Sequence, residues 1–301
     1  MKPESFQHKL ILLLRTVALL LLATSAQAAI ICSVSSAGFS SGYVPANVTT
    51  NITSTTFSVT CSRDNAAGPA SINVRYQVAA GNGLNALATQ NRAALAGSLL
   101  NYHVATDAAC LTPWKGATLL PAAQAIVPMA KNTTVTNIYT YYGCIPAGQL
   151  ALPPEGTYTD TVAITFSGGL PGGATFTNGT FPVSIIAPAT CNITTPPANV
   201  AFAYTAFSPA PVLASATFGV TCTTSLAYTM TLDAAVDVVA GLNYTLALNT
   251  IATGGVNPLT SIGTGIAQSF FINGSMAAGQ AGTCAAPTCS ASQVRTLTIT
   301  Y

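Results

Sequence analysis

Charged and histidine side chains are scarce in this sequence. Charged residues make up 5% of its 301 residues, and the histidines are His8 and His103. Binding to nucleic acid depends on clustered Lys and Arg, and zinc sites use Cys and His at regular spacing. No CxxC pair occurs either. The composition therefore predicts no nucleic-acid binding, no metal site and no cofactor.

Long apolar runs are also missing. The run Val17–Ala23 is shorter than the roughly 20 residues that span a bilayer. Three basic residues between Lys2 and Arg15 precede it, and Ala26-Gln27-Ala28 follows it. This order of basic, apolar and small residues is typical of a secretory signal peptide. We expect residues 1–28 to be removed and the mature chain not to insert into a membrane.

Catalytic side chains are few as well. His103 is the only histidine after residue 28. The string Gly38–Gly42 has the form G-x-S-x-G, but a nucleophile elbow needs a strand before it and a helix after it. Pro45 follows closely, so we interpret the string as a small-residue loop. Asp107 and Asp160 are interpreted as turn residues, and no enzymatic activity is predicted.

What the sequence does contain is an internal repeat, found by comparing its two halves. The first copy opens with CSVSSAGFSSGY at Cys32, and the second opens with CNITTPPANVAFAY at Cys191. Four further matches follow in the same order: TTFSVTC and ATFGVTC, LLNYHV and GLNYTL, YYGCIPAGQ and FINGSMAAGQ, TDTVAITF and VRTLTITY. A repeat of this length indicates two copies of one structural unit.

Each matched segment alternates apolar and polar residues. In the last pair, Val162, Ile164 and Phe166 fall on one face, as do Leu297, Ile299 and Tyr301. Alternation with β-branched residues predicts half-buried strands. Several short strands separated by Gly, Pro, Asn and Ser predict a β-sandwich. The fold class is therefore all-β, with two tandem sandwich domains.

All eight cysteines lie after residue 28. An even number of cysteines in an exported chain favours disulfides. Repeat symmetry pairs Cys32 with Cys61 and Cys191 with Cys222, because each pair would join the first strand of a copy to a later one. The remaining cysteines would then pair as Cys110 with Cys144 and Cys284 with Cys289. Eight cysteines allow 105 pairings, so this pairing rests on symmetry.

The ordered motifs resemble the spore coat U family, which includes the subunits of archaic (Csu-type) chaperone–usher pili. The resemblance rests on C-[SN]-[VI], V-T-C, L-N-Y, G-x-x-x-A-G-Q and T-[VL]-x-I-T-[FY], once in each copy. The family also has G-x-Y-x-D before its last strand. Copy one keeps this motif as Gly156, Tyr158 and Asp160, whereas copy two has Ser292–Arg295 there.

The resemblance implies immunoglobulin-like sandwiches that each lack a final strand. In such pili a neighbouring subunit supplies the missing strand, which is a case of β-strand addition. The implied partners are a periplasmic pilus chaperone, an outer-membrane usher, an adjacent strand-donating subunit, and an abiotic or host surface. The implied location is the pilus tip, reached by export through the periplasm.

A donor strand is expected before the first cysteine of a subunit, and only Ala29–Ile31 would stand there after cleavage. We therefore expect a non-donating, distal subunit. Residues 29–188 would form an N-terminal adhesin domain that is completed by its own segment 174–187. That segment carries the alternating residues Phe181, Val183 and Ile185, and Pro182 counts mildly against it. A plain interdomain linker is the alternative.

Residues 189–301 would form the C-terminal domain. Its last strand, with Leu297, Ile299 and Tyr301, would border an open groove that accepts the strand of a neighbouring subunit.

Copy one is longer than copy two, and much of the excess is apolar. We predict that these stretches are loops, because they contain prolines and do not alternate. An exposed apolar patch usually marks an interaction site. The predicted surface-binding residues are Trp114, Leu119, Leu120, Ile126, Val127, Met129, Leu150, Leu152 and Pro153. The alternative is that these residues extend the core.

Two other functions stay open at this point. One is a coat or pilus-shaft protein without adhesive specificity. The other is a carbohydrate-binding tip, for which Tyr139, Tyr141 and Tyr142 could supply aromatic contacts. The preferred hypothesis is a tip adhesin that supports surface adhesion and biofilm formation.

Overall fold

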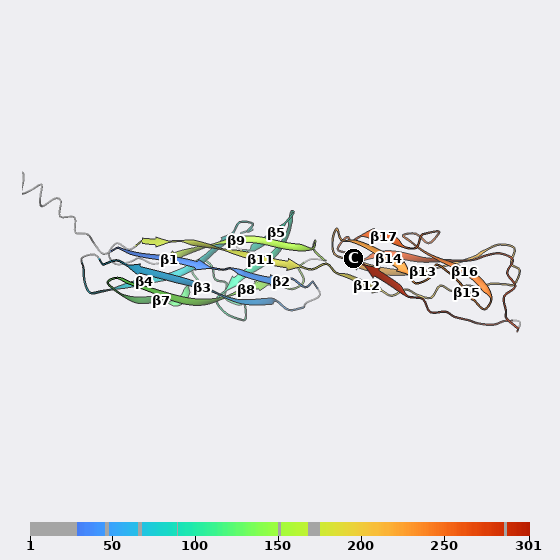
Figure 1. Ribbon diagram of the computed structural model, residues 1–301, viewed down its shortest axis with the longest axis horizontal. Helices are drawn as coiled ribbons and strands as arrows, with labels where there is room; N and C mark the ends of the chain where they lie inside the picture. The colour runs from blue at the N-terminus through green and yellow to red at the C-terminus, as the bar shows by residue number, and fades with distance from the viewer. Residues whose placement is uncertain are drawn as a thin grey trace, which may run out of the picture.

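The computed structural model describes residues 29–45, 48–65, 68–88, 90–149, 152–167, 175–285 and 288–301. These residues form two β-sandwich units that lie end to end along the long axis of the molecule (Figure 1). The predicted signal peptide lies outside the described residues. Within them there is no helix long and apolar enough to cross a membrane. The predicted all-β class with two tandem sandwiches is confirmed.

The first unit follows the alternation seen in the sequence. Its strands are β1 (Ile30–Ser36), β2 (Phe39–Gly42), β3 (Asn51–Arg63), β4 (Ser71–Gly83), β5 (Asn91–Leu95), β6 (Ser98–Ala105), β7 (Leu120–Ala130), β8 (Thr133–Ile145), β9 (Gly156–Ser167), β10 (Thr175–Thr177) and β11 (Gly179–Ala187). One layer has the order β10-β1-β3-β8-β6, and the other has the order β7-β4-β9-β11-β2. Strand β5 joins the layers, because it pairs with both β6 and β9.

The second unit is smaller. Its strands are β12 (Cys191–Thr195), β13 (Val212–Cys222), β14 (Ala227–Leu232), β15 (Val236–Val239), β16 (Leu242–Asn249), β17 (Leu259–Ile262), β18 (Gln268–Met276) and β19 (Leu297–Thr300). They form one sheet in the order β12-β13-β18-β16-β15 and a second in the order β17-β14-β19.

The repeat extends to the pairing of strands. Strand β3 lies between β1 and β8, and β13 lies between β12 and β18. Strand β4 pairs with β7 and β9, and β14 pairs with β17 and β19. Every segment matched in the sequence therefore occupies the same place in its own sandwich. The two units are copies of one topology.

The first core is rich in aromatic side chains. Phe57 on β3 stacks on Trp114, with ring centroids 4.8 Å apart. Tyr141 on β8 contacts Phe181 on β11 across the two layers, at 5.2 Å. Burial raises the pKa of Tyr141 to about 12. The second core is built around Phe218 and Phe270, whose rings stack at 5.6 Å.

The junction between the units is short. Residues 188–190 connect β11 to β12. The backbone and hydroxyl groups of Thr224 in the second unit both donate to the carbonyl oxygen of Leu152 in the first, at 3.2 and 2.8 Å. The C-terminus of the chain also lies at this junction (Figure 1). Hydrogen bonds therefore join the two units in addition to the chain itself.

Candidate functional site

Strand β11 occupies an interior position in the first unit. It pairs antiparallel with β9 and parallel with β2. The predicted donor residues Phe181, Val183 and Ile185 are each at most 1% exposed. Pro182 stands just before the β2 ladder begins at Val183, so its missing N–H falls outside that ladder. The segment is a paired core strand, so the linker alternative does not describe it.

The preceding residues take a different path. Strand β10 pairs in parallel with β1, on the opposite layer from β11. The predicted closing segment 174–187 therefore divides between the two layers. Residue 174 and the glycine-rich turn before it lie outside the described residues.

The place that β11 fills in the first unit is vacant beside β19 in the second. Strand β19 pairs with β14, and no other described strand pairs with it. Leu297 and Ile299 pack against the second core but remain half-buried. Tyr301 is 60% exposed and lines a shallow depression of about 670 Å³ at the end of this sheet.

The segment that corresponds to β2 is also unpaired in the second unit. Val200, Phe202 and Tyr204 alternate toward the core and are half-buried, yet residues 198–204 belong to no ladder. In the first unit the partner of β2 is β11. An added strand next to β19 would therefore satisfy two backbone edges.

The G-x-x-x-A-G-Q motif has a structural role that the sequence did not reveal. A Cβ on Gly143 would lie 2.6 Å from the ring of Phe39, and a Cβ on Gly274 would lie 2.4 Å from the ring of Phe202. Each glycine thus leaves room for an aromatic ring from the segment that follows the first cysteine. The sequence signal for this role was the presence of the glycine at the same position of the motif in both copies.

The glutamine of the same motif binds the Asn of L-N-Y. The Gln149 side chain accepts from the backbone N–H of Asn101 and donates to its carbonyl oxygen. Gln280 makes the same two bonds to Asn243. The two motifs therefore form one backbone clamp per unit.

The tyrosine of L-N-Y differs between the units. The hydroxyl of Tyr102 donates to Asp160 Oδ2 at 2.6 Å, and burial together with this carboxylate raises the pKa of Tyr102. Asp160 Oδ1 accepts from the backbone N–H of Leu84 at 2.8 Å. The prediction that Asp160 is a turn residue is wrong, because it lies within β9 and is 5% exposed.

In the second unit Arg295 takes the place of that aspartate. Its guanidinium donates to the hydroxyl of Tyr244 at 2.8 Å and pairs with Asp237. The Arg295 side chain holds the pKa of the Asp237 carboxyl below its usual range. The second unit, which lacks the G-x-Y-x-D motif, therefore has a partly exposed Arg295–Asp237 ion pair beside its tyrosine, where the first unit has the buried carboxylate of Asp160.

Four of the nine predicted surface-binding residues are buried. Trp114 and Met129 are fully buried, Val127 is 7% exposed, and Pro153 is buried. The Trp114 indole N–H donates to the Val78 carbonyl oxygen at 2.9 Å. Trp114, Val127 and Met129 belong to the first core, and Pro153 is buried, so the prediction of an exposed apolar patch is wrong for these four residues.

The remaining predicted residues are partly accessible. Leu119, Leu120 and Leu152 are half-buried, and Ile126 is 57% exposed. Leu150 lies outside the described residues. Residues 120–130 are the edge strand β7 and not a loop, because Ala125, Val127 and Met129 alternate inward against β4.

One open seam remains between β7 and β8. These strands lie in different layers, and between them lies a shallow depression of about 500 Å³. Its lining consists of Pro121, Ala125, Ile126, Val127, Pro128, Val135, Asn137 and Tyr139. It is the apolar surface of the first unit that overlaps most with the predicted set, and we call it the β7–β8 seam.

The three tyrosines of the carbohydrate hypothesis do not converge. Tyr139 and Tyr141 face the core, where Tyr139 bonds the hydroxyl of Tyr76 at 3.0 Å. Tyr142 lies on the other face of β8. The G-x-S-x-G string is likewise not a loop, because Phe39–Gly42 forms β2.

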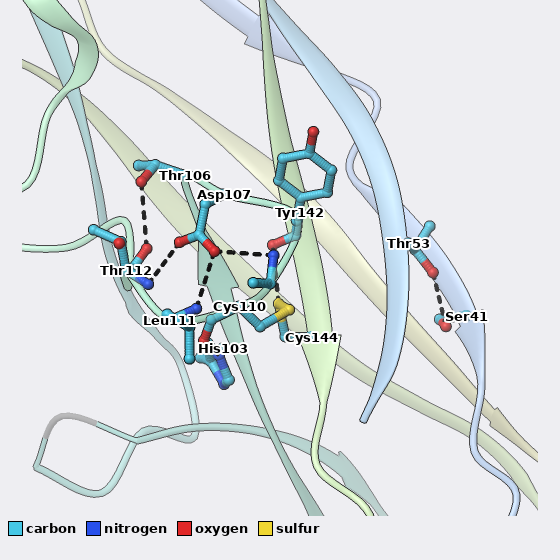
Figure 2. The surroundings of a disulfide bond; sticks show 11 residues. Ser41, Thr53, His103, Thr106, Asp107, Cys110, Leu111, Thr112, Tyr142 and Cys144 are labelled. Atoms are coloured by element: carbon cyan, nitrogen blue, oxygen red, sulfur yellow. Dashed lines mark hydrogen bonds between the residues drawn. A yellow bond between two sulfur atoms is a disulfide. The ribbon is translucent and has the colours of Figure 1, made fainter. Parts of the chain in front are cut away.

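The structure contains the four predicted disulfides, Cys32–Cys61, Cys110–Cys144, Cys191–Cys222 and Cys284–Cys289. Figure 2 shows the second of them beside His103, whose Nε2 lies 3.1 Å from the carbonyl oxygen of Cys110. These three residues are the one group of possible metal ligands found in the described part of the chain. Both sulfur atoms are bonded to each other, whereas zinc binds the thiolate form.

Asp107 organises the loop that carries Cys110. Its carboxylate accepts from the backbone N–H groups of Ala109, Leu111 and Thr112 at 2.9, 3.2 and 2.7 Å (Figure 2). These bonds, with that of Leu111 the largest contribution, lower the pKa of Asp107. The prediction of a turn residue is confirmed here.

Two sandwiches of one topology define a tandem pilin-type fold; β11 pairs with β9 in the first, and among the described strands of the second β19 pairs with β14 alone. The sequence profile of the Spore Coat Protein U domain matches residues 17–165 and 177–253. The chain belongs to this family. No curated protein matches the sequence.

Solved structures of similar outline come from pilus systems. The chaperone–tip subunit pre-assembly complex CsuC–CsuE of Acinetobacter baumannii Csu pili matches at 11% identity and a TM-score of 0.45, covering 89% of this chain and all of that chain. The CupB6 tip adhesin of Pseudomonas aeruginosa matches at 9% identity and a TM-score of 0.35, covering 91% and 95%. A chaperone–tip adhesin complex of CFA/I fimbriae matches at 10% and 0.30, covering 89% and 83%.

Proposed function

We propose that this chain is the tip subunit of a chaperone–usher pilus, with no enzymatic activity. The second unit is anchored to the fibre by a strand from the adjacent subunit, which enters beside β19. The observation that carries the proposal is the contrast between β11, which fills this place in the first unit, and the free edge of β19 in the second.

An added strand would have both backbone and side-chain partners in the second unit. The edge of β19 offers unpaired N–H and C=O groups, and residues 198–204 offer a second row. Half-buried Leu297, Ile299 and Phe202 would be covered. Burying three apolar side chains of the donor would contribute roughly 4.5–9 kcal/mol at about 1.5–3 kcal/mol each.

A free sheet edge also accounts for the proposed partners. Unpaired edges with apolar faces aggregate unless they are covered. A periplasmic pilus chaperone would cover the edge after export, and an outer-membrane usher would exchange it for the neighbouring subunit. The predicted signal peptide and the four disulfides support this route through an oxidising compartment to the cell surface.

The pairing of β11 in the first unit supports a distal position for that unit. Because β11 already lies beside β9, this unit has no corresponding place for an incoming strand. The units lie end to end, so the first unit would project away from the fibre (Figure 1).

The test is to give the second unit its own closing strand. We would append a copy of residues 167–187, which follow Phe166 in the first unit, after Tyr301, the residue that matches Phe166. The expected product is a monomer that needs no chaperone and whose second unit melts at a higher temperature than in the unmodified chain. Calorimetry and size-exclusion chromatography measure both effects.

The matched control carries Phe181→Ser, Val183→Ser and Ile185→Ser in the appended copy only. These substitutions keep the length and the turn but remove the side chains that fill the core. If the control stabilises the second unit as well as the intact copy does, strand insertion is not the cause and the proposal fails.

We further propose that adhesion uses the exposed side chains of the β7–β8 seam of the first unit. Buried residues such as Trp114 and Met129 would take no part in it. Ile126 and Pro128 are the exposed side chains that line it. Ile126→Ser combined with Pro128→Ser should weaken retention on a hydrophobic surface about tenfold, because covering about half of an isoleucine side chain with that surface contributes about 1.4 kcal/mol. Quartz-crystal microbalance measurements on the purified full chain would detect this change.

Ile138→Ser is the matched control for that experiment. Ile138 is 69% exposed on β8 but does not line the seam. Equal losses in both variants would indicate unspecific hydrophobic contact. No loss in either would favour the alternative, a coat or shaft protein without adhesive specificity.

A further inference from the structure

The end of the first unit that lies away from the junction is organised by two adjacent residues, Arg63 and Asp64, where β3 ends. Arg63 is 3% exposed, and its guanidinium donates to the carbonyl oxygens of Met129 at 2.7 Å and Pro69 at 2.6 Å. The carbonyl oxygen of Asp64 accepts from the backbone N–H of Asn132 at 3.1 Å. The two residues therefore join the loop after β3 to the end of β7 and the turn between β7 and β8.

Asp64 also binds the start of β1. Its backbone N–H donates to the carbonyl oxygen of Ala29 at 3.2 Å, and its Oδ2 accepts from the backbone nitrogen of Ala29 at 3.1 Å. The next residue, Ile30, is 1% exposed and pairs with Arg63. Burial of Ile30 and its register with β3 fix the position of the Ala29 nitrogen.

Ala29 is the residue that follows the small-residue sequence Ala26-Gln27-Ala28. Hydrolysis of the Ala28–Ala29 bond adds one water molecule. The new carboxylate leaves with the signal peptide, and the new amine on Ala29 takes up a proton. An α-amino group has a pKa of about 7.7–8.0, so near neutral pH it is mostly an ammonium ion.

We propose that the Ala28–Ala29 bond is the processing site and that the ammonium it leaves on Ala29 pairs with the Asp64 carboxylate. In the precursor the same nitrogen is a neutral amide and forms only an ordinary hydrogen bond. Bonds between two ionised groups are shorter and stronger than neutral ones. Removal of the signal peptide thus completes the outer end of the first unit, and the site of the cut defines the pair.

The position of the nitrogen makes the pair specific to this cut. Cleavage one residue later would leave the ammonium on Ile30, whose backbone belongs to the ladder with β3. Cleavage earlier would leave the charge on a residue before Ala29. The proposal concerns folding after export and does not depend on what the first unit binds.

The test uses the full chain after residue 28 in two forms. One begins at Ala29, and the other carries Gly-Ser before Ala29, so that its nitrogen is an amide. Asp64→Asn is introduced into both. We expect the substitution to lower the melting temperature of the first unit by about 2–4 °C in the form that begins at Ala29 and by under about 1 °C in the extended form.

Hydrogen exchange gives a local readout of the same pair. The amide of Asn132, which donates to Asp64, should exchange about fivefold faster in the Asp64→Asn chain that begins at Ala29. The melting difference should shrink in 1 M salt, where the Debye length is about 3 Å. Asp107→Asn, which removes a carboxylate from another loop, is the matched control and should have the same effect in both forms.

Two outcomes would overturn the proposal. The first is an equal effect of Asp64→Asn in both forms, which would mean that the charge on the Ala29 nitrogen adds nothing to its hydrogen bond with Asp64. The second is a mass spectrum of the exported protein that begins at a residue other than Ala29.

Discussion

The two units share one topology, but they differ beside the last matched strand. In the first unit β11 stands there, and β2 pairs with it to form a regular edge. In the second unit that place is vacant among the described strands, and residues 198–204 run alongside without a ladder. The comparison teaches that the closing strand organises its neighbour as well as filling the core. An open unit therefore has two unpaired edges.

The largest expected effect comes from removing β11. Residues 29–188 alone should fold as a monomer with a cooperative melting transition, whereas residues 29–178 should not fold. Loss of Phe181, Val183 and Ile185 from the core costs roughly 4.5–9 kcal/mol, which is comparable to the total stability of about 5–15 kcal/mol of a typical domain. Circular dichroism and chromatography would distinguish the two fragments.

Phe181→Ala in the longer fragment is the graded version of that experiment. It should lower the free energy of unfolding by about 3–5 kcal/mol. Ile186→Ala on the same strand should change it far less, because Ile186 is 48% exposed. If residues 29–178 fold without β11, the first unit does not need this strand, and the proposed difference between the two units is wrong.

Each unit has one disulfide without a counterpart in the other, and these two disulfides should contribute differently to the free energy of unfolding. Cys110 and Cys144 are 34 positions apart, and Cys284 and Cys289 are 5 apart. On loop-closure entropy the first bond contributes about 4 kcal/mol and the second about 2 kcal/mol. Calorimetry of the chain with paired Cys→Ser substitutions measures both. A larger loss from the short loop would mean that the segment it closes is integral to the second unit.

The smallest effect concerns the tyrosine of L-N-Y. Asp160→Asn should destabilise the first unit by about 1.5–3 kcal/mol, because a buried, charged acceptor is replaced by an amide. Arg295→Gln should destabilise the second unit by less, because its ion pair with Asp237 is partly exposed to solvent. Comparable losses would indicate that the two tyrosines depend equally on their partners.

Much of the fold could be predicted because it is repeated. Each matched segment alternates with period two, and the order of the matches gives the order of equivalent strands. The pairs Cys32–Cys61 and Cys191–Cys222 followed from the same symmetry, and the other two pairs followed from the cysteines that remained. Features present in one copy only had no such support.

Strand β7 shows why the rest could not be predicted. Its inward residues Ala125, Val127 and Met129 alternate, but Ile126 and two prolines stand between or near them and hide the pattern. Trp114 has no counterpart in the second copy, so nothing in the sequence indicated that it stacks on Phe57. Proline on an edge strand costs little, because the outer N–H has no ladder partner.

The direct connection of β11 to β12 has a mechanical consequence. A pull along the long axis of the molecule would reach the first unit through Ala187, at the end of its closing strand. Since β11 runs along that axis (Figure 1), the force would act parallel to the strand and load the hydrogen bonds from Gly179 to Ala187 together, in shear. Such bonds cannot be opened one at a time, so the strand that closes the first unit is also positioned to carry tension.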